Sequence, residues 1–226
     1  MVRALAISDV LLDALYSPWI LTRFADVNII LGCGDLPYYY LEYVLTTLNR
    51  PLYYVRGNHA YLVEHTIQGP KTHPHGAVDL HRRIVRRGGL ILAGVEGSLR
   101  YRPGAYQYTQ QEMWLHILRL IPGLLWNKAA YGRYLDVFVT HAPPWGIHDQ
   151  PDRPHQGIKA FRWILDVIRP AFHFHGHIHV YRQDTEKITK YKETTVINAY
   201  GFIEAMIAPA QKSFAPFGFL TRRVNP

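Results

Sequence analysis

Short apolar runs recur along the chain, and a polar residue suited to acid–base or metal chemistry follows each of them closely. Runs of this length, bounded by turn-forming residues, are typical of buried strands. We expect strands at VRALAI (2–7), VNIIL (27–31), PLYYV (51–55), LDVFV (135–139) and AFHF (171–174).

Three longer segments have apolar residues at helical spacing. They are YLEYVLTTLNR (40–50), TQQEMWLHILRLI (109–121) and IKAFRWILDVIRP (158–170). The second begins with a Thr-x-x-Glu capping box from Thr109 to Glu112. Strands that alternate with helices predict an α/β architecture, in which ligands gather beyond the carboxyl ends of the strands.

The polar residues after the predicted strands are therefore expected to converge on one site. Each of them alone has a plainer explanation, as a turn residue, a helix cap or a core histidine. A shared site explains better why all five runs lead into such residues. The candidates are Asp9, Asp35, Asn58, His59, His141 and the histidines of HGHIH (175–179).

The stretch FHFHGHIHV (172–180) carries four alternating histidines, which on a continuous strand would share one face. Gly176 lets the backbone leave strand geometry in the middle of this stretch. We therefore expect His173 and His175 to pack or to give supporting hydrogen bonds, and His177 and His179 to be ligands.

Composition narrows the class of protein. The chain has 226 residues, of which 48% are hydrophobic and 19% charged, as in a globular protein, and we expect one domain over 1–226. The lone Cys33 and the lack of a long apolar run predict a cytoplasmic protein without membrane contact.

The formal net charge of +8 favours anionic ligands, although a basic surface without a binding role explains it equally well. The densest basic cluster, HRRIVRRGG (81–89), has helical spacing and predicts a solvated helix face. It lacks the interleaved aromatic residues of a nucleic-acid platform. A nucleic-acid partner is therefore not favoured.

Several motifs together resemble the calcineurin-like metallophosphoesterases. These are Gly34-Asp35, GNH (57–59), the lone histidine of VTHAPP (139–144) and GHIH (176–179), in the family's order and approximate spacing. The stretches THAPPWGIHD and HGHIH also resemble the branch with bacterial phosphoesterases and metazoan phosphodiesterases.

The resemblance implies a four-layer α/β/β/α sandwich of two mixed sheets with a two-metal centre. It implies that Asp35 bridges the metals, that Asn58, His141 and His177 complete the second site, that Asp9 and His179 serve the first, and that His59 approaches the phosphate. Such a centre holds a bridging hydroxide for in-line attack on phosphorus. Mixed nitrogen and oxygen ligands suit Mn, Fe, Zn or Co.

Three positions depart from the family pattern. Leu11 stands where the histidine of Asp-x-His is usual, Tyr38 replaces the second acid of GDxxD, and Ala60 replaces the acid after GNH. Leucine cannot bind a metal. Either water or a side chain such as Asp13 fills the gap, or the first metal binds weakly, or only one metal binds.

Two loops are candidates for the substrate pocket. GIHDQPDRPHQG (146–157) carries His148, Asp149 and His155, and is either a pocket wall or a solvated loop. GSLRYRPGAYQYT (97–109) is either a specificity loop or a surface connection.

The leading hypothesis is a metal-dependent hydrolase of phosphate esters, with phosphodiesters preferred over monoesters. Its expected partner is a small phosphate ester such as a nucleotide. One alternative is a metal- or nucleotide-binding regulatory module with a degenerate first site and little catalysis. A nuclease ranks lower because the sequence shows no dedicated DNA-reading element.

Overall fold

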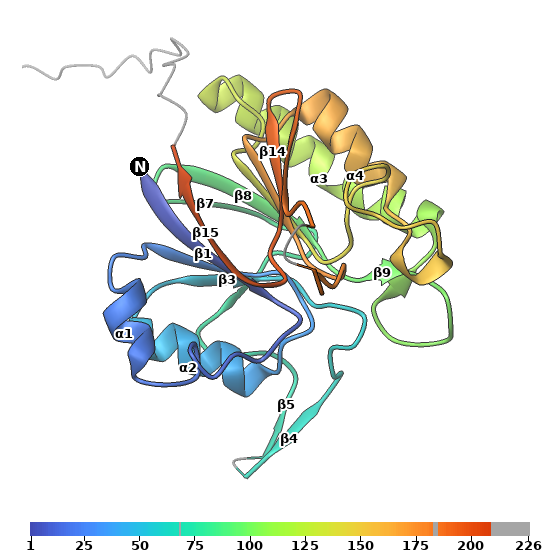
Figure 1. The fold of residues 1–226 in the computed structure, drawn as a ribbon. Coiled ribbons are helices and arrows are strands. Elements are labelled where there is room, and N and C mark those ends of the chain that lie inside the picture. The colour runs from blue at the N-terminus through green and yellow to red at the C-terminus, as the bar shows by residue number, and fades with distance from the viewer. Residues whose placement is uncertain (68, 183–184, 209–226) are drawn as a thin grey trace, which may run out of the picture.

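The computed structural model describes residues 1–67, 69–182 and 185–208, and two mixed β-sheets form its centre (Figure 1). The five-stranded sheet has the order β15-β1-β2-β3-β6, with only β15 antiparallel to its neighbour. Its strands are β1 (Val2–Ser8), β2 (Ile29–Gly32), β3 (Leu52–Tyr54), β6 (Val78–Asp79) and β15 (Gly201–Ile207).

The second sheet has six strands in the order β13-β14-β12-β11-β8-β7. Its two edge strands are antiparallel to their neighbours and the inner strands are parallel to one another. The strands are β7 (Ile84–Arg87), β8 (Leu90–Val95), β11 (Val137–Thr140), β12 (Phe172–His175), β13 (Ile188–Tyr191) and β14 (Thr194–Asn198).

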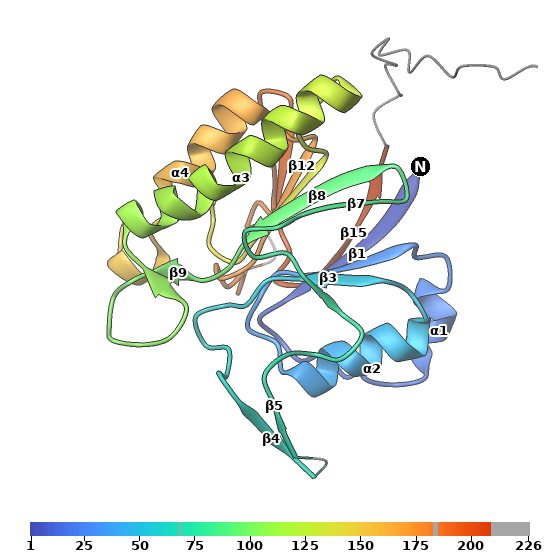
Figure 2. The ribbon, with the colours of Figure 1, turned by 180° about the vertical axis from the view of Figure 1, so that it is seen from behind.

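Two short strand pairs extend from this body. The antiparallel pair β4 (Glu64–Thr66) and β5 (Gly69–Lys71) forms an arm that projects beyond α2, and the parallel pair is β9 (Ser98–Leu99) and β10 (Gln107–Tyr108) (Figures 1 and 2). The helical elements are α1 (Trp19–Phe24), α2 (Tyr38–Leu48), α3 (Gln110–Tyr131), α4 (Lys159–Trp163), the 3₁₀ turn η1 (Arg153–His155) and the π-helical turn η2 (Ile164–Ile168).

Strand alternation builds four layers. In β1, Ala4 and Ala6 face the other sheet, whereas Leu5 and Ile7 face α1 and α2. In β11, the side chain of Phe138 instead packs with α3 and α4. Because both faces of these strands are buried, they appear in the sequence as continuous apolar runs. The predicted α/β/β/α sandwich is confirmed.

The helices differ in length from their predictions. The capping box of Thr109 and Glu112 is present, but α3 continues through Pro122 and ends only at Gly132, which has a φ of 73°. Leu124, beyond the proline, is fully buried, and this packing offsets the lost hydrogen bond. Within the described residues, no helix is long and apolar enough to cross a membrane.

The prediction of a helix face at 81–89 is wrong. Residues Ile84–Arg87 form the edge strand β7, which pairs antiparallel with β8. Gly88 and Gly89 both have positive φ, 61° and 79°, and so form the tight turn of a hairpin. This Gly-Gly turn signal outweighs the helical spacing of the arginines. The predicted single domain runs to residue 226, but residues 209–226 lie outside the described part.

Candidate metal centre

The carboxyl ends of strands from both sheets meet at one edge of the sandwich. Asp9, Asp35 and His177 lie just beyond β1, β2 and β12. All three have left-handed backbones, with φ of 66°, 54° and 69°, which is uncommon for residues other than glycine. Such strained positions cluster at functional sites, because the surrounding structure must hold them in place.

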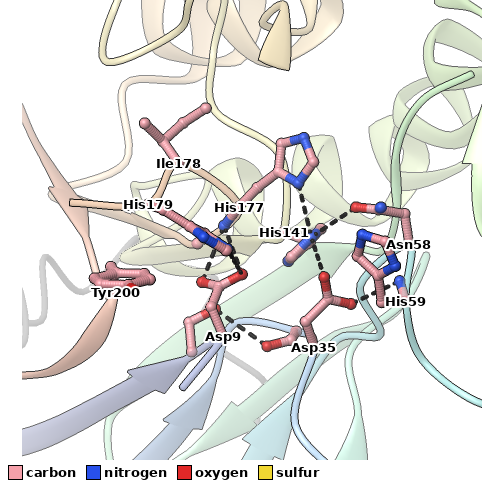
Figure 3. A network of polar contacts seen from close by, with 12 residues as sticks. Asp9, Asp35, Asn58, His59, His141, His177, Ile178, His179 and Tyr200 are labelled. Atoms are coloured by element: carbon pink, nitrogen blue, oxygen red, sulfur yellow. Dashed lines mark hydrogen bonds and ion pairs between the residues drawn. The ribbon is translucent and has the colours of Figure 1, made fainter. Parts of the chain in front are cut away.

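Four donor atoms converge at this edge (Figure 3). Around the Nε2 atom of His141 lie Oδ1 of Asn58 at 3.0 Å, Nδ1 of His177 at 3.1 Å and Oδ2 of Asp35 at 3.3 Å. Neighbouring ligands of one metal ion lie about 3.0–3.5 Å apart when the metal–ligand bonds are about 2.1 Å. These separations therefore fit a single divalent cation.

Supporting hydrogen bonds fix which atoms face the cluster. Nδ1 of His141 lies 2.9 Å from the carbonyl oxygen of Cys33, and Nε2 of His177 lies 2.7 Å from that of Pro154. In its neutral form each ring donates its N–H to the carbonyl, so the other nitrogen presents a lone pair to the cluster. The amide of Asn58 donates to the Tyr101 hydroxyl at 3.4 Å, which leaves its oxygen toward His141.

The electrostatics of the cluster favour a positive charge within it. Burial opposes the imidazolium form of His141, but the Asp35 carboxylate and its hydrogen bond raise the pKa of His141 to about 9. Burial also opposes ionisation of Asp35, yet His141 outweighs it and lowers the Asp35 pKa to about 2. Burial and the charge of His141 lower the pKa of His177 to about 3. In the protein alone, a proton on His141 supplies the charge that a metal would bring.

Two glycines let the chain pass close to these side chains. A Cβ atom at Gly57 would overlap Oδ1 and the backbone nitrogen of Asp35, and one at Gly176 would overlap the side chains of Ser8 and Asp9. The glycines of GNH and GHIH are therefore required by the close approach of neighbouring segments.

The predicted first-metal ligands are less tightly grouped. Both carboxylate oxygens of Asp9 accept the backbone N–H of His177 at 3.1 Å, whereas Nε2 of the partly exposed His179 is 4.0 Å from Oδ1 of Asp9. Nδ1 of His179 contacts the Tyr181 hydroxyl at 2.9 Å, and its ring lies 4.9 Å from that of Tyr200 (Figure 3). Burial raises the pKa of Asp9 above its usual value.

Among the described residues, only Asp35, His141 and His177 form a group of three or more His, Cys, Asp or Glu side chains close enough to share a metal. Asn58 adds an amide oxygen to this group. The structure thus brings together the four side chains predicted for the second site, with Asp9 and His179 nearby.

His59 lies at the mouth of the site. Its backbone N–H donates to Oδ1 of Asp35 at 2.8 Å, and the residue is exposed. It lines a cavity of about 230 Å³ together with Asp9, Asp35 and Leu11. The side chain is free to approach a ligand bound beside Asp35.

The three candidate residues of the loop 146–157 have different surroundings. His148 contacts Nε2 of His175 and Oγ1 of Thr189, both at 2.8 Å, and the carboxylate of Asp149 accepts backbone N–H groups within its own loop. Only the ring of His155 stands against a candidate ligand, 5.4 Å from the ring of His177.

The prediction for the other two alternating histidines is confirmed. His173 is fully buried and its Nε2 lies 2.8 Å from Oγ1 of Thr140, while His175 is buried against His148. Neither belongs to the metal-ligand group.

Two contributions to the centre were not predicted from the sequence. The carbonyl of Pro154 orients His177, and the hydroxyl of Tyr101 orients Asn58. The role of a backbone carbonyl cannot be predicted from the sequence, because every residue has one. Tyr101 lies in the aromatic and basic segment 97–109, whose composition was the available signal.

The fold and the donor cluster together define a metallophosphoesterase-type protein. The family model for calcineurin-like phosphoesterases matches residues 5–181, and the chain therefore belongs to this family. No curated protein matches the chain at a significant level.

Solved structures share the fold at low sequence identity. One has a TM-score of 0.61 at 14% identity, covering 91% of this chain and 99% of its own. Another, phosphopantetheinyl hydrolase from Mycobacterium tuberculosis, has a TM-score of 0.50 at 15% identity, covering 92% of this chain and 90% of its own.

Proposed function

We propose that this protein is a metal-dependent phosphodiesterase. The observation that carries the proposal is the convergence of three donor atoms, from Asp35, Asn58 and His177, to within 3.3 Å of Nε2 of His141. All four atoms are acceptors when the histidines are neutral, so a bound cation can take the place of the proton on His141 and hold them together.

A divalent metal fits this donor set. Two imidazoles, one amide and one carboxylate favour Mn, Fe, Zn or Co over Ca, and a single carboxylate keeps the bound ion electrophilic. When bound, such a metal supplies Lewis-acid stabilisation of the phosphoryl oxygens and a strong nucleophile near neutral pH. Asp9 and His179, together with the shared Asp35, would form the first metal site. This site would hold its ion more weakly than the second site does.

The residues around the metal position have distinct tasks. The N–H of His59 on Oδ1 of Asp35 fixes that carboxylate and places the His59 side chain at the cavity. There His59 can donate a proton to the leaving oxygen of the ester. The basic net charge of +8 favours approach of an anionic phosphodiester.

Turnover of bis-p-nitrophenyl phosphate with Mn²⁺ tests the proposal. We expect His59→Ala to reduce kcat by about 10²–10³-fold for an alkyl phosphodiester, whose leaving oxygen needs the proton, and by much less for bis-p-nitrophenyl phosphate. Asn58→Ala should weaken metal binding by about 10–100-fold. His75→Ala, a change at an exposed histidine, is the matched control and should keep full activity. Turnover no higher than that of the metal-free protein, whichever transition metal is added, would refute the hydrolytic function.

One observation favours a second candidate function, a metal-dependent binding module with little catalysis. Leu11 offers no donor, and Nε2 of His179 is 4.0 Å from Asp9. This candidate predicts one tightly bound metal and nucleotide binding without hydrolysis. His179→Ala would then leave the metal content unchanged, whereas in a two-metal enzyme it would empty the first site. His177→Ala should weaken the second site in either case.

A further inference from the structure

The three positions that depart from the family pattern lie around one cavity. Leu11, Tyr38 and Ala60 come from separate segments of the chain, yet all three line the cavity of about 230 Å³ at the metal centre. The same cavity is also lined by Asp9, Asp35 and His59. Three departures that are far apart in the sequence thus alter the lining of the same cavity.

The departures add apolar groups to the lining of this cavity. Leu11, Leu36, Pro37, Tyr38 and Ala60 all contribute to it, together with the exposed Tyr61. Leu11 is 49% exposed, so its side chain is accessible to a ligand.

The polar atoms of Tyr38 and Glu64, which also line the cavity, already have hydrogen-bond partners within the protein. The hydroxyl of Tyr38 donates to the carbonyl oxygen of Tyr61 at 2.8 Å, so its ring is held in the wall. The carboxylate of Glu64 accepts the backbone N–H groups of Tyr38 and Tyr39, at 2.6 and 3.2 Å, at the first turn of α2. The wall therefore presents carbon to a ligand, while Asp9, Asp35 and His59 present charge and a proton.

The size of the cavity limits what it can hold. An engineered apolar protein cavity of about 150 Å³ binds benzene, and pockets for drug-sized ligands begin at about 300 Å³. A cavity of about 230 Å³ therefore suits one aromatic ring or an alkyl group of similar size.

We propose that this cavity is a specificity pocket for the leaving group, and that the substrates are phosphate esters of an aryl-bearing or compact alkyl alcohol. The proposal rests on the proposed function, because the phosphate must lie at the metal centre for its ester group to enter the cavity. His59, the proposed proton donor to the leaving oxygen, lines the same cavity as Leu11, so the leaving alcohol would lie in this cavity.

Binding of two phosphonates that cannot be hydrolysed tests this assignment. Benzylphosphonate and methylphosphonate carry the same anionic head and differ in the apolar group. With the protein saturated in Mn²⁺, isothermal titration calorimetry should show benzylphosphonate binding at least about tenfold tighter, or about 1.4 kcal/mol.

Two variants locate the preference. Leu11→Asn makes the apolar wall polar, and Ala60→Leu fills the cavity; each should bring the ratio of the two affinities toward one. Leu118→Asn is the matched control, because Leu118 is 55% exposed on α3 and is not among the residues that line the cavity. It should keep the wild-type ratio.

Equal affinities in the wild type, no binding of either phosphonate, or an unchanged ratio in both variants would overturn the pocket assignment. Turnover of bis-p-nitrophenyl phosphate separates this result from the proposed function. Turnover without a benzyl preference would refute the pocket alone. A benzyl preference lost in the variants, without turnover, would support the pocket and refute hydrolysis.

Discussion

Replacement of Asp35 by asparagine tests the electrostatics of the donor cluster, because it keeps the shape of the side chain and removes its charge. The pKa of His141 rises from 6.5 to about 9, which corresponds to about 3 kcal/mol. The pKa of Asp35 falls from 3.8 to about 2, which corresponds to about 2–3 kcal/mol. Both values describe one ion pair, so in metal-free protein Asp35→Asn should lower the free energy of unfolding by about 2–3 kcal/mol.

The destabilisation should depend on pH in a defined way. The lowered pKa of Asp35 stabilises the fold above about pH 4, and this contribution is lost as the pH falls through about 2. The raised pKa of His141 stabilises the fold below about pH 6.5, and that contribution is lost as the pH rises through about 9. The wild type and Asp35→Asn should therefore differ most near pH 5.5, and the difference should vanish or reverse by pH 10.

Urea unfolding in EDTA at both pH values measures this difference. Asp152→Asn is the matched control: Asp152 pairs with His155 on the surface, where the loss should be below about 1 kcal/mol. At pH 7, Mn²⁺ at a hundred times its Kd should stabilise the wild type by about 2.7 kcal/mol and Asp35→Asn far less. Equal destabilisation at both pH values, or none at pH 5.5, would refute the assigned ion pair.

Three further predictions follow from the supporting residues. Gly57→Ala places a Cβ atom against Asp35, and calorimetry should show at least about tenfold weaker Mn²⁺ binding; unchanged affinity would contradict the close approach. Tyr101→Phe removes the hydrogen bond to Asn58, worth about 0.5–1.5 kcal/mol, and should weaken Mn²⁺ binding a few-fold while lowering the melting temperature by no more than a few degrees. His173 is buried with a pKa lowered to about 3, so protonation of the unfolded chain below about pH 6.5 should cost the wild type about 2 kcal/mol of stability between pH 7.5 and 5. In urea unfolding His173→Phe should lose about 2 kcal/mol less than the wild type over this range, because His177 and the other buried histidines keep their share of the loss, and an equal loss in both proteins would refute the role of His173.

The layered fold could be predicted because its signal is local and repeated. Strands buried on both faces, such as β1 and β11, appear as apolar runs, and the capping box at Thr109 marks the start of α3. The local sequence patterns gave the wrong helix end or the wrong type of element where contacts distant in sequence determine the structure. The burial of Leu124 carries α3 past Pro122, and the Gly88-Gly89 turn makes a strand from residues with helical spacing.

The candidate site could be predicted as a set of residues but not as a geometry. The position of Asp35, Asn58, His141 and His177 after strand ends was enough to predict that they meet. Their orientation depends on partners distant in sequence, such as the carbonyl of Pro154 behind His177. The grouping of all three atypical residues around one cavity likewise requires the fold, because their spacing along the chain carries no sign of it.

The most direct test of the central claim is the metal content at saturating Mn²⁺, measured by elemental analysis and located by anomalous diffraction. We predict a strongly occupied metal among Asp35, Asn58, His141 and His177, which is lost in His141→Ala. A metal elsewhere, full retention of this metal in His141→Ala, or no bound metal at all would contradict the account.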